Sequence, residues 1–298
     1  MVLRRTSGNA MDFVCVCVRI PKCGSTSLTN SLKAAFAGRK IFHLPHSVDF
    51  EGEFSRFQRL RFRRSQVRSL LSQYQTPDFG EACRLIGHWA ADGDLISGGH
   101  IDFPTVHAHI GRPVKMITLL RDPLARCRSE YNYCRQAYQR KAAISRIDMT
   151  IKHRIAGRFS FPDYLDFLLE HAEIYGNLAA RYIGWDGRQP VAHYFAQHVF
   201  HAGVLEDSVG FAHGLVRKMG IPVLFPHENR TTLRIASAGS GERAKIEKLY
   251  PLDMTLYEWQ LLHAEEDYAA EAAEFELNIP AWYASLFNQA KQALFAHA

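Results

Sequence analysis

Residues 13–27 read FVCVCVRIPKCGSTS, and this stretch decides the expected fold. It opens on an apolar run rich in valine, which is typical of a short strand buried on both faces. The residues that follow combine proline, glycine and hydroxyl side chains, and they predict a sharp turn. Apolar side chains then recur at helical spacing until Gly38 supplies a stop. The stretch therefore predicts a strand, a loop and a helix in direct succession.

A second unit of the same kind begins at residues 114–120, which read VKMITLL. Asp122 is suited to cap a helix and Pro123 to occupy its first turn, so a helix is expected from there to about Gln139. Strands followed directly by helices indicate an α/β fold with a parallel sheet. Because such sheets bind ligands at the carboxyl ends of their strands, the loops after both strands are candidate binding sites.

The remainder of the chain is compatible with one domain over residues 1–298. Residues after 150 show mostly helical periodicity, with apolar faces within 164–169 and 211–219. Residues 97–100 read SGGH and predict a turn, and 224–229 predict a last short strand before terminal helices. Neither an internal repeat nor a linker interrupts this pattern.

Composition restricts the functional classes. The chain has 298 residues, of which 47% are hydrophobic and 22% charged, as expected for a globular protein rather than a disordered or fibrous one. No run of 18 apolar residues occurs and the amino terminus lacks the pattern of a secretory signal, so we expect a soluble cytoplasmic protein, with peripheral membrane association as the alternative. The six cysteines form no CxxC pair, which predicts reduced thiols. The histidine pairs 43/46, 107/109 and 198/201 lack clustered ligand companions, so no metal is expected.

The balance of charge favours anionic partners. Lysine and arginine number 36 against 30 acidic residues, a net charge of +6. Six arginines lie between Arg56 and Arg68, whereas residues 265–276 are acidic. The arginine segment has two interpretations: it lies beside a cleft and holds an anionic saccharide, or it is a solvated helix face whose Phe57 and Leu60 pack inward.

The loop after the first strand has the chemistry of an anion cradle. It supplies the following residues: Lys22, Gly24, Ser25, Thr26 and Ser27. Unpaired amides at a helix start and the helix dipole both attract an anion. In a nucleoside-triphosphatase loop the lysine follows the second of two glycines, whereas here the lysine precedes the only one. Binding of a phosphate that needs no metal is therefore favoured over ATP hydrolysis, and a merely capped helix start is the plain alternative.

Arg121, Arg126 and Ser129 follow the second strand. The spacing from 126 to 129 places a guanidinium and a hydroxyl on one helical face, so a second anion site is expected at the neighbouring strand end. The plain alternative is a capped helix start with Arg121 in a surface ion pair.

These two motifs resemble those of sulfotransferases that use 3′-phosphoadenosine-5′-phosphosulfate (PAPS), most closely the carbohydrate enzymes of the heparan-sulfate-2-O type. RIPKCGSTS at 19–27 is similar to the family's 5′-phosphosulfate loop, and RDPLARCRSEY at 121–131 is similar to its 3′-phosphate motif. Weaker similarity continues at 98–100, 227–229 and 250–257. The resemblance implies a P-loop-like, three-layer α/β fold with a central, mostly parallel sheet flanked by helices.

The resemblance also implies roles for single residues. Lys22 would contact the bridging and 5′-phosphate oxygens, within a donor loop that runs from Cys23 to Ser27 and whose amides and hydroxyls would hold the 5′-phosphate. Arg121 and Ser129 would bind the 3′-phosphate, which distinguishes PAPS from ATP. The product would be 3′-phosphoadenosine 5′-phosphate.

Sulfuryl transfer to an alcohol needs a base near the acceptor hydroxyl and a cation on the departing phosphate. Lys22 is expected in the second role, with no metal. For the base we choose His100, which matches the family's Gly-His position and titrates near neutrality. His88 is the rival, and an ordinary structural histidine is the plain alternative for His100.

The sequence thus predicts a PAPS-dependent O-sulfotransferase whose acceptor is a carbohydrate or glycolipid, anionic if the arginine segment contacts it. No nucleic-acid partner is expected. Two alternatives stay open: a P-loop nucleotide kinase or triphosphatase that uses ATP and magnesium, and a non-catalytic polyanion-binding module whose affinity falls steeply with salt. The sequence motifs do not predict the identity of the acceptor, the choice between O- and N-sulfation, or the oligomeric state.

Overall fold

The computed structural model describes residues 11–44, 79–141, 149–219 and 239–275. The arginine segment, the strand predicted at 224–229 and the last terminal helix therefore lie outside the described residues. The chain divides into two compact units, Met1–Gln260 and Leu261–Ala298. The candidate site lies entirely in the first unit, and a single functional domain over the whole chain stays a prediction.

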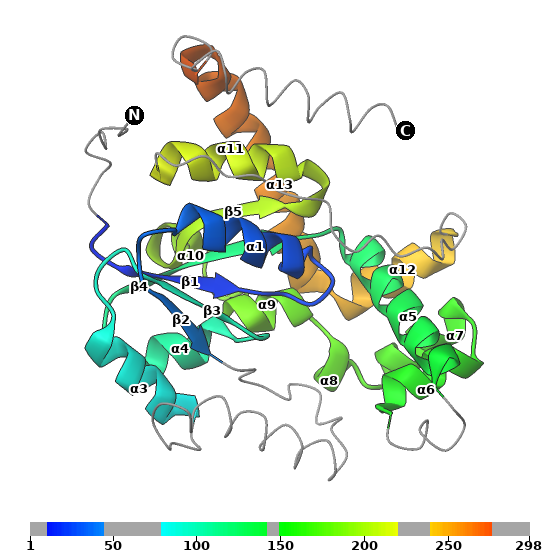
Figure 1. The fold of residues 1–298 in the computed structure, drawn as a ribbon. Helices are drawn as coiled ribbons and strands as arrows, with labels where there is room; N and C mark the ends of the chain where they lie inside the picture. The colour runs from blue at the N-terminus through cyan, green and yellow to red at the C-terminus, as the bar shows by residue number, and fades with distance from the viewer. Residues whose placement is uncertain (1–10, 45–78, 142–148, 220–238, 276–298) are drawn as a thin grey trace. The chain divides into compact units, whose positions relative to one another are not determined.

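A parallel sheet forms the centre of the first unit (Figure 1). Within the described residues the sheet has five strands, ordered β2-β3-β1-β4-β5, and every neighbouring pair is parallel. Their bounds are β1 Val14–Val18, β2 Ile41–Leu44, β3 Leu95–Gly98, β4 Val114–Leu120 and β5 Val199–Val204. The predicted α/β class is confirmed. The two strands expected from the sequence, β1 and β4, are hydrogen-bonded neighbours, so the loops that follow them meet at one edge of the sheet.

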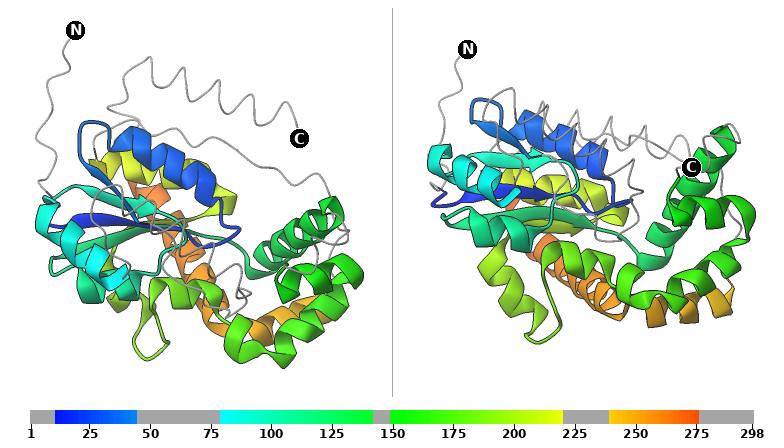
Figure 2. Two further views of the ribbon diagram at one scale, coloured as in Figure 1. Left: turned by 60° about the horizontal axis from the view of Figure 1, so that its bottom comes forward. Right: turned by 90° about the horizontal axis from the view of Figure 1, so that it is seen from below.

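Helices cover both faces of this sheet, which gives the three layers expected (Figure 2). One face carries α1 (Ser25–Ala35) and α11 (Ser208–Met219); the other carries α4 (Phe103–His109), α9 (Leu178–Ile183) and α10 (Val191–His198). The helix α3 (Phe79–Trp89) packs against β2 and α4. None of the helices in the described ranges has the length and apolar character needed to cross a bilayer.

The central core explains why β1 reads as a continuous apolar run. All its residues are buried, and alternate ones point to opposite faces of the sheet. Cys15 and Cys17 pack beneath Leu28 and Leu32 of α1, together with side chains from β4 and α11. The apolar face predicted on α11 belongs to this core.

A second hydrophobic cluster lies among helices beyond the carboxyl end of β4. It joins α5 (Pro123–Arg140), α6 (Ile151–Arg158), α7 (Phe161–Glu170), α8 (Ala172–Tyr175) and α12 (Ser240–Leu249), together with Tyr250, which directly precedes α13 (Pro251–Phe275). Tyr131 of α5 stacks edge-on against both Phe161 and Tyr164 of α7, with ring centroids 5.3 Å apart in each pair. The helix predicted to reach Gln139 ends at Arg140. This cluster fixes α5 at the edge of the sheet where the loops meet.

Three of the described strands were not anticipated: β2 (Ile41–Leu44), for which no element was predicted, and two strands in regions that were interpreted differently. Ser97 and Gly98, expected in a turn, form the end of β3, and the bend begins only at Gly99. The strand β5 lies in a region whose periodicity indicated mostly helix. Both strands are short, and β5 contains His201 and Gly203, which weaken an apolar strand pattern. Hydrogen bonds from β3 to β1 and β2, and from β5 to β4, stabilise these two strands although their local sequence favours a strand only weakly.

All six cysteines are buried and free, as predicted for reduced thiols. Burial raises the pKa of Cys15, Cys17, Cys23 and Cys127 to about 12. These thiols are therefore neutral and weakly reactive at pH 7.

Gly98 is required by the close approach of two strands, because a Cβ there would lie 1.7 Å from the carbonyl oxygen of Leu44 on β2. We expect Gly98→Ala to lower the free energy of unfolding by about 1–3 kcal/mol through overpacking. Urea denaturation measures this change.

The matched control is Gly241→Ala on α12, where a Cβ meets nothing within 4 Å. Alanine there is expected to stabilise the helix by up to about 1 kcal/mol. Equal midpoints of urea denaturation for Gly98→Ala and Gly241→Ala would contradict the close approach of β2 and β3 at Gly98.

Candidate functional site

The loop between β1 and α1 has an unusual backbone. Lys22 and Gly24 both adopt left-handed conformations, with φ of 67° and 68°, while Cys23 between them does not. For lysine this conformation costs about 1–2 kcal/mol, so the surrounding structure must impose it. Alternating backbone handedness turns successive amides toward one concave side, a geometry that binds anions.

The amino end of α1 opens onto this loop. The first helical hydrogen bond runs from the Leu28 amide to the Gly24 carbonyl oxygen at 3.0 Å. Within the described residues no side chain caps this helix. Ser25 is half-buried, Thr26 is exposed and Ser27 is buried. The amides of the first turn point out of the helix toward the loop, and Thr26 beside them is accessible, as a phosphate site requires.

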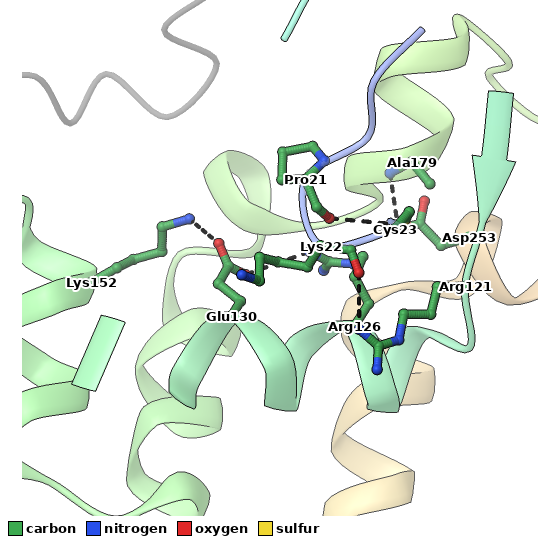
Figure 3. Close-up of polar contacts among 9 residues, drawn as sticks. All are labelled: Pro21, Lys22, Cys23, Arg121, Arg126, Glu130, Lys152, Ala179 and Asp253. Atoms are coloured by element: carbon green, nitrogen blue, oxygen red, sulfur yellow. Dashed lines mark hydrogen bonds and ion pairs between the residues drawn. The ribbon is translucent and has the colours of Figure 1, made fainter. Parts of the chain in front are cut away.

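Arg121 joins the two predicted motifs. It follows β4 directly, and its Nη1 donates to the carbonyl oxygen of Lys22 at 3.0 Å (Figure 3). Asp122 caps α5 as predicted, accepting from the Ala125 amide at 2.7 Å, with Pro123 in the first turn. The structure thus brings Lys22 and Arg121, which are 99 residues apart in the chain, into direct contact.

The ammonium of Lys22 lies over an aromatic ring of α5. Its Nζ is 4.3 Å from the centroid of Tyr133. Burial lowers the pKa of Lys22, and the charge of Arg121 acts in the same direction. Ser129 precedes Tyr133 by four residues on the helix and therefore shares its face. Lys22, Arg121 and Tyr133 accordingly meet at the junction of the loop and α5, and the role of Ser129 stays a prediction.

His100 lies at the same edge of the sheet. It follows β3, and its Nδ1 is 2.6 Å from the carbonyl oxygen of Arg19. Because a carbonyl oxygen only accepts, Nδ1 carries the hydrogen, and Nε2 carries the lone pair of the neutral ring. Arg19 in turn donates through Nη1 to the Gly98 carbonyl oxygen. The sequence suggested His100 as the base, and the structure places it against the backbone of Arg19, three residues before Lys22.

His88 lies elsewhere. It is exposed on the last turn of α3, and the chain from this helix leads into the amino end of β3. Two residues after His88, the carbonyl oxygen of Ala90 accepts a hydrogen bond from Arg112, which precedes the amino end of β4. The rival base therefore lies near the amino ends of the strands, whereas the loop lies at their carboxyl ends.

Beneath the site, charged side chains form a buried network. The carboxylate of Glu130 receives Nζ of Lys152 at 2.5 Å and Nη1 of Arg126 at 3.5 Å (Figure 3). Burial alone would raise the pKa of Glu130, but the charges of Lys152 and Arg126 outweigh it and lower the pKa to about 2. Arg126 is 1% exposed and its guanidinium stacks 4.6 Å from the Tyr250 ring centroid. The structure therefore turns Arg126 into the interior, whereas spacing had suggested that it faces an anion together with Ser129.

Two further features lie under the loop. The side chain of Cys23 is 1% exposed and its Sγ donates to the Pro21 carbonyl oxygen at 3.8 Å, so this predicted donor-loop residue offers only its backbone to a ligand. Asp253 accepts from the amides of Ala179 and Ala180 at 3.0 and 2.9 Å, which ties α13 to the start of α9. Burial raises the pKa of Asp253, and the charge of Arg126 opposes this.

Several buried nitrogens at the site have no hydrogen-bond acceptor among the described residues. They include the Nε atoms of Arg19 and Arg121. A buried donor without a partner is costly and calls for a bound water or ligand. The chemistry of these donors, together with the loop amides and Lys22, fits an anion with several oxygens.

Sequence reasoning missed Tyr133, Lys152 and Glu206. Helical spacing from Ser129 was a usable signal for Tyr133, whereas nothing in the sequence connects Lys152 with Glu130. Glu206 follows β5 and accepts from the Asp122 amide at 3.2 Å. Burial raises the pKa of Glu206, which the neighbouring Arg121 opposes.

No protein-family model matches the chain, and no curated protein matches it. Among solved structures the chain is similar to the crystal structure of a sulfotransferase from Alicyclobacillus acidocaldarius, with 16% sequence identity and a TM-score of 0.39. That match covers 84% of this chain and 95% of the other.

Within the described ranges no three His, Cys, Asp or Glu side chains gather as a metal ion would require. The expectation that the protein uses no metal stays a prediction.

Glu130→Gln removes the charge that Lys152 and Arg126 share, and we expect it to lower the free energy of unfolding at pH 7 by about 3–5 kcal/mol, since both cations stay buried. The folded-state pKa near 2 lies below the ordinary 4.5, so the stability from Glu130 is present above pH 4.5 and is lost as the pH falls toward 2. Urea denaturation from pH 5 to pH 3 is expected to show a shallower decline in the variant than in the native protein.

Glu247→Gln serves as the control, because Glu247 pairs with Arg243 on the exposed surface of α12. Its expected cost is below about 0.5 kcal/mol. Identical pH dependence in the native protein and in Glu130→Gln would show that Glu130 is not held by its neighbours.

Proposed function

We propose that this protein is a PAPS-dependent sulfotransferase that transfers a sulfuryl group to a hydroxyl of a carbohydrate or glycolipid. The observation that supports this most is the contact between the two motifs: Arg121 of the 3′-phosphate-like motif hydrogen-bonds the backbone of Lys22 in the 5′-phosphosulfate-like loop. One doubly phosphorylated adenosine is then able to contact both motifs.

The charge of the site supports an anionic donor. Neither Lys22 nor Arg121 forms an ion pair within the part of the chain that the structure describes. The acidic residues below the loop are already engaged, Glu130 by Lys152 and Arg126, and Asp253 by two backbone amides. The cations at the surface of the site thus stay available to phosphate oxygens.

Lys22, the amides of residues 24–27, Arg121 and Ser129 would hold the donor, which supplies the sulfuryl group when bound. Nε2 of His100 accepts the proton of the acceptor hydroxyl as the new bond from oxygen to sulfur forms. Lys22 donates hydrogen bonds to the phosphate oxygen that departs as the old sulfur–oxygen bond breaks. The products are a sulfate ester, protonated His100 and 3′-phosphoadenosine 5′-phosphate.

The position of the histidines supports His100 over His88 as the base. His100 is bound to the backbone three residues before Lys22, whereas His88 is at the other edge of the sheet. A proton acceptor acts only within hydrogen-bond reach of the hydroxyl, so the position of a histidine is the first criterion for its role as the base.

We expect 3′,5′-diphosphoadenosine to raise the melting temperature by roughly 5 °C at a hundred-fold excess over its dissociation constant. Adenosine 5′-monophosphate is expected to raise it less, and Ser129→Ala to narrow the difference between the two nucleotides. A thermal-shift titration measures both effects.

Two further ligands in the same titration separate the alternatives. A larger shift with ATP and magnesium would indicate a nucleotide kinase or triphosphatase. A response to heparin alone, abolished by salt, would indicate a polyanion-binding module. Either outcome would overturn the sulfotransferase proposal.

His100→Asn is expected to lower kcat about 10²–10⁴-fold, because the proton acceptor is lost. Lys22→Met is expected to lower kcat at least about 10²-fold, because the departing charge is no longer stabilised. Sulfuryl transfer from labelled PAPS to a panel of saccharides and glycolipids gives the rates.

His88→Asn is the matched control and is expected to keep the native rate. Full turnover in His100→Asn combined with loss in His88→Asn would show that the assignment of the base is wrong.

A further inference from the structure

The backbone of Lys22 is fixed independently of its side chain. Its left-handed conformation and the hydrogen bond from Arg121 set the direction in which the side chain leaves the loop. A lysine side chain still has four rotatable bonds beyond this point, so a fixed backbone does not fix the ammonium. Something else must hold Nζ at one place.

The ring of Tyr133 is the group that contacts the ammonium, with Nζ 4.3 Å from the ring centroid. Within the described residues Nζ makes neither a hydrogen bond nor an ion pair. The nearby carboxylate of Glu130 attracts it, but that carboxylate is occupied by Lys152 and Arg126. The cation–π contact is therefore the direct restraint on the position of the ammonium.

Tyr133 is itself well supported. It lies on α5, whose start is capped by Asp122 and whose buried face packs on α6 and α7. The His153 ring meets the Tyr133 ring at 65° with centroids 5.9 Å apart, and Nδ1 of His153 is 2.6 Å from Oγ1 of Thr150. The ring is nevertheless 51% exposed. A large aromatic side chain that is half exposed beside a candidate catalytic lysine is better explained by the site than by the core.

A neutral ring suits this task better than a carboxylate would. An aspartate or glutamate in its place would hold the ammonium more strongly but would also neutralise the charge that a phosphate needs to meet. The quadrupole of an aromatic ring attracts the cation and leaves its net charge unchanged. The contact also favours the charged form of a lysine whose pKa is lowered by burial.

We propose that Tyr133 is a positioning residue that holds the ammonium of Lys22 over its ring before the donor binds. This inference rests on the role of Lys22 in the proposed function and adds the group that orients it. Tyr133 contributes its ring and not its hydroxyl, so phenylalanine is expected to replace it and leucine is not.

The test compares Tyr133→Leu with Tyr133→Phe. Lysines dimethylated with a ¹³C label keep their charge and give separate NMR signals, and the signal missing in Lys22→Arg identifies Lys22. We expect this signal to show an upfield ring-current shift in the native protein and in Tyr133→Phe, and to lose the shift in Tyr133→Leu. In parallel, kcat is expected to fall about 3- to 10-fold in Tyr133→Leu and to stay within about two-fold in Tyr133→Phe. Melting temperatures are expected to change by no more than ~2 °C, since the side chain is exposed.

The outcomes separate the possible roles. An unshifted signal in the native protein, or a shift that persists in Tyr133→Leu, overturns the proposal. A rise in the acceptor KM with unchanged kcat also overturns it and indicates that the ring binds the acceptor instead. If the native protein binds no 3′,5′-diphosphoadenosine, the proposed function fails, and the NMR comparison alone then decides whether Tyr133 holds Lys22.

Discussion

The hydrogen bond from Arg121 to the carbonyl oxygen of Lys22 connects the ends of two adjacent parallel strands. The site depends on this contact because Lys22 has a backbone conformation that a lysine does not adopt by itself. The ammonium lies over the Tyr133 ring of α5, so separate contacts hold the backbone and the side chain of Lys22. The two motifs predicted from the sequence are thereby joined through a single carbonyl group.

The buried network below the loop shows how this arrangement is supported. Arg126, Glu130, Lys152 and Asp253 are nearly inaccessible, and each faces a group of opposite charge or a pair of backbone amides. Such groups are weak contributors to stability when compared with well-packed apolar side chains. They instead provide structural specificity, because they hold α5, α6, α9 and α13 in one arrangement around the loop. A site built from the ends of several elements needs that specificity more than it needs additional stability.

The sequence predicted those parts of the protein whose signals are local. The β1 and β4 runs, the Asp122 cap and the loop residues from Lys22 to Ser27 each depend on neighbouring residues, and the structure has them as expected. What was missed depends on contacts between distant segments. The strands β2, β3 and β5 form because of their neighbours in the sheet. Arg126 is buried because Glu130 and Tyr250 receive it, and Lys152 reaches Glu130 from another helix. The arginine segment lies outside the described residues, so its two interpretations are both still predictions. His100 was chosen as the base through resemblance, a choice that stays a prediction, and the position of the loop relative to β3 separates it from His88.

The burial of every cysteine has a practical consequence. Maleimides and iodoacetamide react with thiolates at the surface, and this chain presents none of its native thiols there. A cysteine introduced at an exposed position, such as Thr26 at the mouth of the loop, would therefore be modified selectively in the otherwise unaltered chain. Because the native thiols are buried, a fluorophore or spin label would attach only to the introduced cysteine, beside the candidate site.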